Sequence, residues 1–243
     1  MQDEIDRYAR STRLISFDPR VKLAATIVFI VVLAFMREPL AVWISLTFAL
    51  MMVEISGVPM RHIGHNFLLT FPFILIASLA LLLTAGWMSA LLMGMRISAS
   101  ILVLLVLVST TPFFDTLRAL RWFRVPPLMC NLMMFTYRFI FVLLDEMGRM
   151  RLSRKARGFT GGKSLLDRSA FTTLSNTIGM VFVRANDRAN HIYNALLARG
   201  YNGEVRSATP LKAKGRDVVF AIAYLISATI LVAAQLGVLH WTL

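Results

Sequence analysis

Long runs of apolar residues alternate with short charged segments over the first half of the chain, and one more run lies near its end. We expect five of these runs to be helices that cross a membrane, at residues 21–36, 40–53, 67–86, 97–111 and 218–241. The run at 67–86 carries no charge and has the length of about 20 residues that spans a hydrocarbon core. The pattern therefore predicts an all-α membrane protein with about five transmembrane helices.

A different pattern lies between the fourth and the fifth apolar run. From residue 112 to 217, apolar positions recur among many charged ones, which indicates helices with one face in water. Two long helices are expected here, one from about Pro127 to Arg157 and one that ends near Arg199. The sequence thus predicts three parts, namely a membrane part at 1–111, a cytoplasmic helical domain at 112–217 and a final transmembrane helix at 218–243.

One apolar stretch within the cytoplasmic domain, at 128–144, leaves two alternatives open. It is apolar enough to cross a membrane, but Asn131, Thr136 and Arg138 interrupt it, and it continues into a charged segment without a break. We favour a helix whose first half lies at the membrane interface and whose second half lies in water. A sixth crossing remains the alternative.

Composition and charge agree with a membrane protein and suggest its orientation. The 243 residues are 57% hydrophobic and 16% charged, and the net charge is +13. Of the 26 Lys and Arg residues, all but Arg37 and Arg96 fall in segments that are cytoplasmic if the N-terminus is inside and the C-terminus outside. The excess of positive charge in these segments follows the positive-inside rule, so we expect no nucleic-acid partner. The single cysteine, Cys130, cannot form an internal disulfide.

The string Ala-Arg-Gly occurs twice, each time at the expected end of a long helix and before an aromatic residue. The two copies are Ala156, Arg157 and Gly158 before Phe159, and Ala198, Arg199 and Gly200 before Tyr201. Glycine commonly ends a helix in the left-handed conformation, so each copy can be an ordinary C-cap. A cap does not require the flanking alanine, arginine and aromatic residue. The repetition therefore favours two equal docking ends, each presenting a guanidinium to a carboxylate of a partner.

Four segments give the chain a resemblance to a known family. The segments at 17–23, 110–127, 136–159 and 188–204 contain "FDPRVKL", "TTPFFDTLRALRWFRVPP", "TYRFIFVLLDEMGRMRLSRKARGF" and "RANHIYNALLARGYNGE". They resemble the transmembrane T component of energy-coupling factor (ECF) transporters, and in particular its cobalt-type branch, CbiQ. The resemblance covers most of the chain from about Asp18 onward.

The resemblance implies a function and a set of partners. Two ABC-type ATPase subunits would sit beneath the T component and each receive one end of a coupling helix, and a separate membrane subunit would bind the substrate. Arg157 and Arg199 would contact the ATPases, and Ala156, Gly158, Ala198 and Gly200 would shape the helix ends. The resemblance also implies the bacterial inner membrane and cobalt as the substrate, with nickel or a vitamin as alternatives.

The sequence offers little chemistry of its own. No P-loop motif, nucleophile–base arrangement or set of metal ligands is apparent, and the pair His62 and His65 lacks further ligands. We therefore expect no enzymatic activity, no cofactor and no metal site in this chain. The alternative function is a membrane scaffold whose basic cytoplasmic domain binds anionic lipid.

Overall fold

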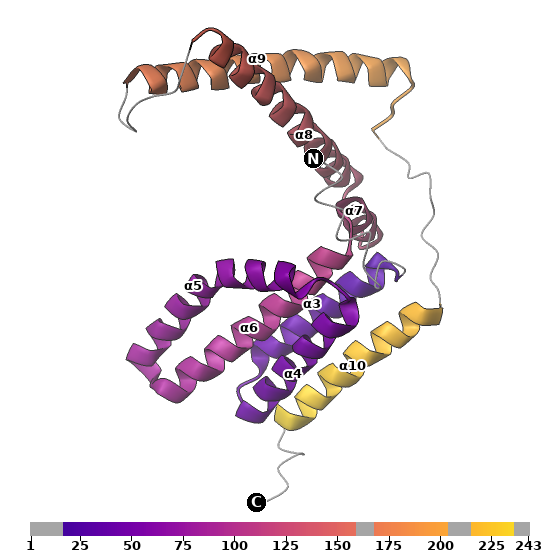
Figure 1. The fold of residues 1–243 in the computed structure, drawn as a ribbon. Helices are drawn as coiled ribbons and strands as arrows, with labels where there is room; N and C mark the ends of the chain where they lie inside the picture. The colour runs from indigo at the N-terminus through magenta and orange to yellow at the C-terminus, as the bar shows by residue number, and fades with distance from the viewer. Residues whose placement is uncertain (1–16, 159–167, 204–214, 236–243) are drawn as a thin grey trace, which may run out of the picture. The chain divides into compact units, whose positions relative to one another are not determined.

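A computed structural model describes residues 17–158, 168–203 and 215–235 (Figure 1). All regular secondary structure in these residues is helical, which confirms the expected all-α fold. The helices are α3 (Pro19–Phe35), α4 (Pro39–Ser56), α5 (Met60–Ala85), α6 (Trp87–Thr110), α7 (Phe113–Trp122), α8 (Pro127–Ala156), α9 (Arg168–Ala198) and α10 (Gly215–Gln235).

The chain divides into two compact units. We call the first the bundle unit; it comprises Gln2–Phe123 and Ala208–Leu243 and contains α3 to α7 and α10. The second, the two-helix unit, comprises Arg124–Ser207 and contains α8 and α9. The short helix α7 packs on α3 and so belongs to the bundle by its contacts. The part boundaries expected from the sequence, at 111/112 and 217/218, refer to the membrane surface and stay predictions.

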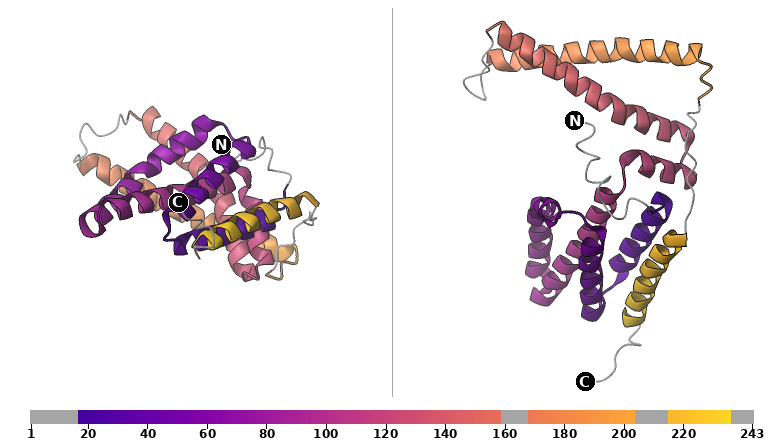
Figure 2. Two further views of the ribbon diagram at one scale, coloured as in Figure 1. Left: turned by 90° about the horizontal axis from the view of Figure 1, so that it is seen from below. Right: turned by 45° about the vertical axis from the view of Figure 1, so that its right-hand side comes forward.

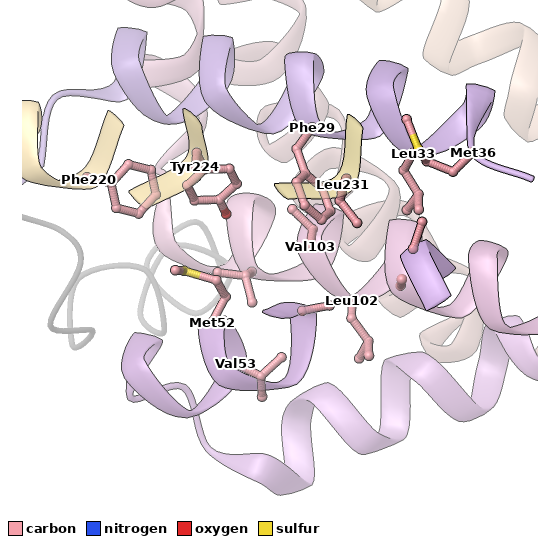
Figure 3. Close-up of a cluster of buried hydrophobic side chains, with 14 of the residues drawn as sticks. Phe29, Leu33, Met36, Met52, Val53, Leu102, Val103, Phe220, Tyr224 and Leu231 are labelled. Carbon is pink, nitrogen blue, oxygen red and sulfur yellow. The ribbon is translucent and has the colours of Figure 1, made fainter. Parts of the chain in front are cut away.

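The core of the bundle unit is formed where α3, α4, α6 and α10 meet (Figure 3). Phe29 of α3 is completely buried and packs against Phe48 and Tyr224, with ring centroids 5.0 and 5.9 Å apart. Other buried members of this cluster are Leu33, Met36, Met52, Val53, Leu102, Val103, Phe220 and Leu231. Buried positions of α3 recur every three or four residues, so one face of the helix packs inward.

The start of α3 is held by two aspartates. Asp18 is the N-cap, as the sequence predicted, and its Oδ1 accepts the backbone N–H of Arg20 at 2.9 Å, while Pro19 occupies the first turn. The backbone N–H of Asp18 in turn donates to Oδ1 of Asp217, at 2.7 Å. The first turn of α3 is thereby joined to the first turn of α10.

Two basic side chains bind the C-terminal carbonyl groups of each other's helices. Lys22 of α3 is buried and donates from Nζ to the carbonyl of Thr110, the last residue of α6, at 3.3 Å. Arg96 of α6 donates from its guanidinium to the carbonyl of Met36, the C-cap of α3. Cations favour the negative end of a helix, so this exchange stabilises both ends of the antiparallel pair. The sequence alone indicated no partner for either side chain.

Five helices in the described residues are long and apolar enough to cross a membrane, namely α4, α5, α6, α8 and the part of α10 from Asp217 to Gln235. The set differs from the five spans expected from the sequence, because it includes α8 and omits α3, which has 17 residues. A length of 17 residues is at the lower limit for a span. Whether α3 and the stretch at 128–144 cross the membrane therefore stays a prediction.

Helix α5 departs most from its expected form. It begins at Met60, ahead of the apolar run expected at 67–86, and has Pro72 in its interior. The ribbon bends along this helix (Figure 1), as an interior proline removes a hydrogen bond and clashes with the preceding turn. Its buried residues are Ile63 and Ile74, and most of the apolar side chains from Leu68 to Leu83 are exposed.

Candidate coupling sites at two helix ends

The first Ala-Arg-Gly string ends α8. Ala156 is the last helical residue and Arg157 is the C-cap. Gly158 follows with φ of 81°, in the left-handed region, and its N–H donates to the carbonyl of Lys155 at 3.0 Å. The expected glycine cap is confirmed here. Phe159, the aromatic residue of this copy, lies outside the described residues.

The second string ends α9 in the same way. Ala198 is the last helical residue, and Gly200 has φ of 76°. The N–H of Gly200 donates to the carbonyl of Leu197 at 2.9 Å, and the N–H of Tyr201 donates to that of Leu196 at 3.0 Å. These two bonds define a Schellman motif. The bond made by the glycine is the same at both helix ends, so the two strings adopt the same local backbone structure.

The aromatic residue after the second string joins α9 back to α8. The phenol of Tyr201 accepts a hydrogen bond from Nδ2 of Asn131, at 3.5 Å, and the same amide donates to the carbonyl of Gly203 at 2.8 Å. Tyr201 also lines an apolar groove together with Leu196, as expected for an aromatic residue that folds onto the last turn. The sequence did not predict the role of Asn131; the signal for it was a polar residue inside an apolar stretch.

All six residues of the two strings are exposed. A Cβ atom added to Gly158 or Gly200 would meet no atom within 4 Å. Within this chain, the glycines are therefore required by their positive φ and not by a close approach of another segment. The exposed alanines leave room beside each helix end for a surface from outside the chain.

The charge around the end of α8 is strongly positive. Its last turns carry Arg151, Arg154, Lys155 and Arg157. The nearest acidic side chain along this part of α8, Glu146, is engaged by two arginines: Arg149 at 2.7 Å and Arg184 of α9. Hydrogen bonds from Arg149 and Arg184 hold the pKa of Glu146 below its usual value. A partner that docks here is expected to be acidic.

An apolar groove lies between the two long helices. In Figures 1 and 2, α8 and α9 diverge from a common end where α8 finishes and α9 begins. The groove has a volume of about 490 Å³. Its lining residues on α8 are Leu128, Leu132, Phe135, Phe139, Val142 and Leu143, and on α9 they include Ala185, Ala189, Ile192, Tyr193 and Leu196. Such a splayed pair leaves much of its apolar surface without partners in this unit.

Metal-ligating side chains do not gather in the described residues. Among them, no three His, Cys, Asp or Glu side chains lie close enough together to hold a metal ion. Nε2 of His62 lies 3.1 Å from Nδ2 of Asn66 in the same helix. The expectation that this chain alone binds no cobalt stays a prediction.

A family model and one curated relative name the same family. The model of the cobalt transport protein family CbiQ matches residues 11–211. The cobalt transport protein CbiQ of Rhodobacter capsulatus is 33% identical over 143 residues, which cover 58% of this chain and 56% of that protein. An uncharacterised protein of Methanocaldococcus jannaschii is 22% identical over 257 positions. That match covers 96% of this chain and 87% of the Methanocaldococcus protein. The match to the Rhodobacter protein thus spans little more than half of that relative.

Proposed function

The chain belongs to the CbiQ family of cobalt transport proteins, and we propose that it is the membrane coupling subunit of an ATP-driven importer of the energy-coupling factor type. The observation that carries this proposal is the pair of helix ends. Both present an exposed Ala-Arg-Gly string on the same glycine cap, with φ of 81° and 76° at the two glycines. Two equal ends fit two equal receptors, as a pair of ABC-type ATPase subunits would provide.

In the proposed mechanism each arginine pairs with a carboxylate in a groove of one ATPase subunit. Arg157 and Arg199 follow the last helical residues directly, so their backbone is fixed by the cap. Long helices transmit displacement because their backbone hydrogen bonds keep them stiff. When the ATPase subunits move together and apart, α8 and α9 would carry that movement to a separate membrane subunit that holds the substrate. The chain itself would be non-catalytic.

The proposal includes an orientation and a cargo. ATPases act in the cytoplasm, so both helix ends must lie there, with the N-terminus inside, the C-terminus outside and the chain in the bacterial inner membrane. The excess of Lys and Arg in the segments assigned to the inside supports this orientation. The family points to cobalt as cargo. Nickel and vitamins, carried by other members of the wider class, are the alternatives to test by uptake.

The central test removes both arginines. The chain would carry an affinity tag and be co-expressed with ABC-type ATPase subunits from the same organism. Removing one partner of a buried charge pair costs about 2–5 kcal/mol, because the other charge is left unpaired. We therefore expect Arg157→Ala with Arg199→Ala to weaken ATPase retention about thirtyfold or more and to abolish cobalt uptake.

A matched control removes two other positive charges, one from each of the same two helices. Arg138→Ala with Arg188→Ala changes exposed arginines of α8 and α9 that lie outside the strings and away from the positive end of α8. This control should retain the ATPases, and both variants should insert into the membrane in normal amounts, because a last-turn charge contributes only about 0.3–1 kcal/mol to a helix. If the string variant keeps its ATPases and transports normally, the strings are caps and nothing more.

A second test concerns orientation and decides whether α8 crosses. In a Cys130→Ala background, a single cysteine replaces Trp87, at the start of α6, or Ser153, near the end of α8. On the proposed topology, a membrane-impermeant thiol reagent labels W87C in intact cells and labels S153C only after permeabilisation. Labelling of S153C from outside would show that α8 crosses, and would remove the α8 end from the reach of a cytoplasmic ATPase.

A further inference from the structure

A second apolar groove lies in the bundle unit, along α3 and α10. Its volume is about 390 Å³, which falls within the range of about 300–1,000 Å³ typical of small-ligand sites. Its apolar walls are formed by Val21, Ala24, Ala25, Val28, Ala221 and Leu225. Tyr224 also lines the groove and belongs to the bundle core, whereas Val28 and Leu225 are exposed, so the groove opens on the outside of the bundle.

One end of this groove carries a cation and an aromatic ring. Arg20 and Trp122 both line the groove, and the guanidinium carbon of Arg20 lies 5.6 Å from the centre of the Trp122 ring. Arg20 is in the first turn of α3, and Trp122 is the last residue of α7. Tryptophan is enriched where a membrane meets water, because its ring is apolar and its N–H is polar.

The guanidinium of Arg20 lacks an anionic partner in the described part of the chain. No carboxylate there lies within ion-pair distance of it, and its Nε is buried without a hydrogen-bond acceptor. The one acidic residue that lines the groove, Asp18, is mostly buried, and its Oδ1 accepts the backbone N–H of Arg20. The arginine side chain is thus placed at the mouth of an apolar groove, and no carboxylate of residues 17–158, 168–203 or 215–235 forms an ion pair with it.

We propose that this groove binds an anionic phospholipid, with one acyl chain along α3 and α10 and the phosphate against Arg20. Basic pockets between transmembrane helices are known to bind the headgroups of anionic lipids. A planar guanidinium also suits the bidentate recognition of phosphate. A protein helix in the same place would have to bury the charge of Arg20, which is costly unless it brings a carboxylate.

The inference requires the bundle unit to lie in a membrane, and it does not depend on the role of the two helix ends. A lipid in this position would contact α3, α7 and α10 at once, since these helices supply all the lining residues except Asp18, the N-cap of α3. It would also supply the acceptor that Arg20 lacks. The lipid would then stabilise the packing of α7 against α3 in membranes that contain anionic lipid.

The test compares lipids retained by the purified full-length chain. The detergent-solubilised protein is mixed with equal amounts of phosphatidylglycerol and phosphatidylcholine of the same acyl composition, and the bound lipids are counted by native mass spectrometry. The wild type should retain phosphatidylglycerol in preference. Arg20→Gln should reduce that preference about fivefold, the effect of one basic residue at a membrane surface. Ala24→Phe, which fills the groove, should reduce retention of both lipids.

Two further variants make the outcome decisive. Arg37→Gln removes an exposed arginine just beyond the opposite end of α3 and should leave the lipid preference unchanged. Arg20→Lys keeps the positive charge and should keep most of the preference. The proposal is overturned if the wild type shows no preference, or if Arg37→Gln lowers it as much as Arg20→Gln. Equal and low retention of both lipids in all variants would mean that another protein segment covers the groove, which would also overturn it.

Discussion

The bundle unit and the two-helix unit handle apolar surface in opposite ways. In the bundle unit, α3, α4, α6 and α10 bury a shared cluster that includes Phe29, Leu33 and Leu231. In the described residues of the two-helix unit, the buried side chains are Cys130, Asn131 and Thr177, while apolar residues such as Leu152 and Phe182 stay exposed. The bundle unit therefore has an internal apolar core, whereas the two-helix unit exposes most of its apolar side chains.

The two units also differ in how they use positive charge. In the bundle unit, Lys22 and Arg96 donate to helix carbonyl groups and so stabilise the bundle itself. In the two-helix unit, Arg157 and Arg199 are exposed at the ends of the helices. Basic residues therefore contribute to internal packing in one unit and are available for recognition in the other.

The largest expected difference between the units comes from removing a phenylalanine. In the core of a soluble protein, Phe→Ala lowers the free energy of unfolding by about 3–5 kcal/mol. We expect the lower end of this range for Phe29→Ala. Lipid replaces water around the bundle, so the variant loses mainly packing contacts. Phe139→Ala in α8, whose ring stacks on Phe135 at 6.3 Å, should cost about 1 kcal/mol. Equilibrium unfolding in mixed micelles measures both. Equal losses would contradict the contrast between the units.

A smaller effect, of opposite sign in two variants, tests the helix caps. Gly200→Ala places a side chain at φ of 76° and should destabilise the end of α9 by about 1–2 kcal/mol. Gly179→Ala, in the interior of the same helix with open space around it, should stabilise the helix by about 0.5–1 kcal/mol. Hydrogen exchange of the amides in the last turns of α9 reports the first effect. Destabilisation by both variants would mean that the positive φ does not explain why position 200 is a glycine.

The smallest effect concerns pH and the ion pairs between α8 and α9. The pKa of Glu146 is lowered by Arg149 and Arg184, so the folded unit favours the carboxylate form. The stabilisation is therefore complete above the pKa of a glutamate in the unfolded chain and is lost as the pH falls through the lower pKa of the folded unit. Below that pH the protection factors of the amides in α8 and α9, which correct for the intrinsic exchange rate, should fall, and Glu146→Gln should remove this pH dependence. An unchanged profile in the variant would show that other groups cause it.

Much of the local structure followed from the sequence, because its causes act over a few residues. The helical period of apolar positions, the cap formed by Asp18 before Pro19, and the glycines that end α8 and α9 all depend on residues at most five positions apart. These features gave the all-α class, the two long helices and the exposed Ala-Arg-Gly strings. The predicted start of the third helix, at residue 67, was wrong. The largely polar residues 61–66 belong to the same helix, which begins at Met60.

The contacts that join distant helices were decided by the tertiary structure. Three side chains donate hydrogen bonds to backbone carbonyl groups that lie 60 to 88 positions away in the sequence. They are Lys22 to Thr110, Arg96 to Met36 and Asn131 to Gly203. The groove between α3 and α10 and the placement of Arg20 over Trp122 belong to the same group. A side chain's own helix fixes only the direction in which it leaves the backbone. Its partner depends on which helices pack together, and the residue types alone do not determine that arrangement.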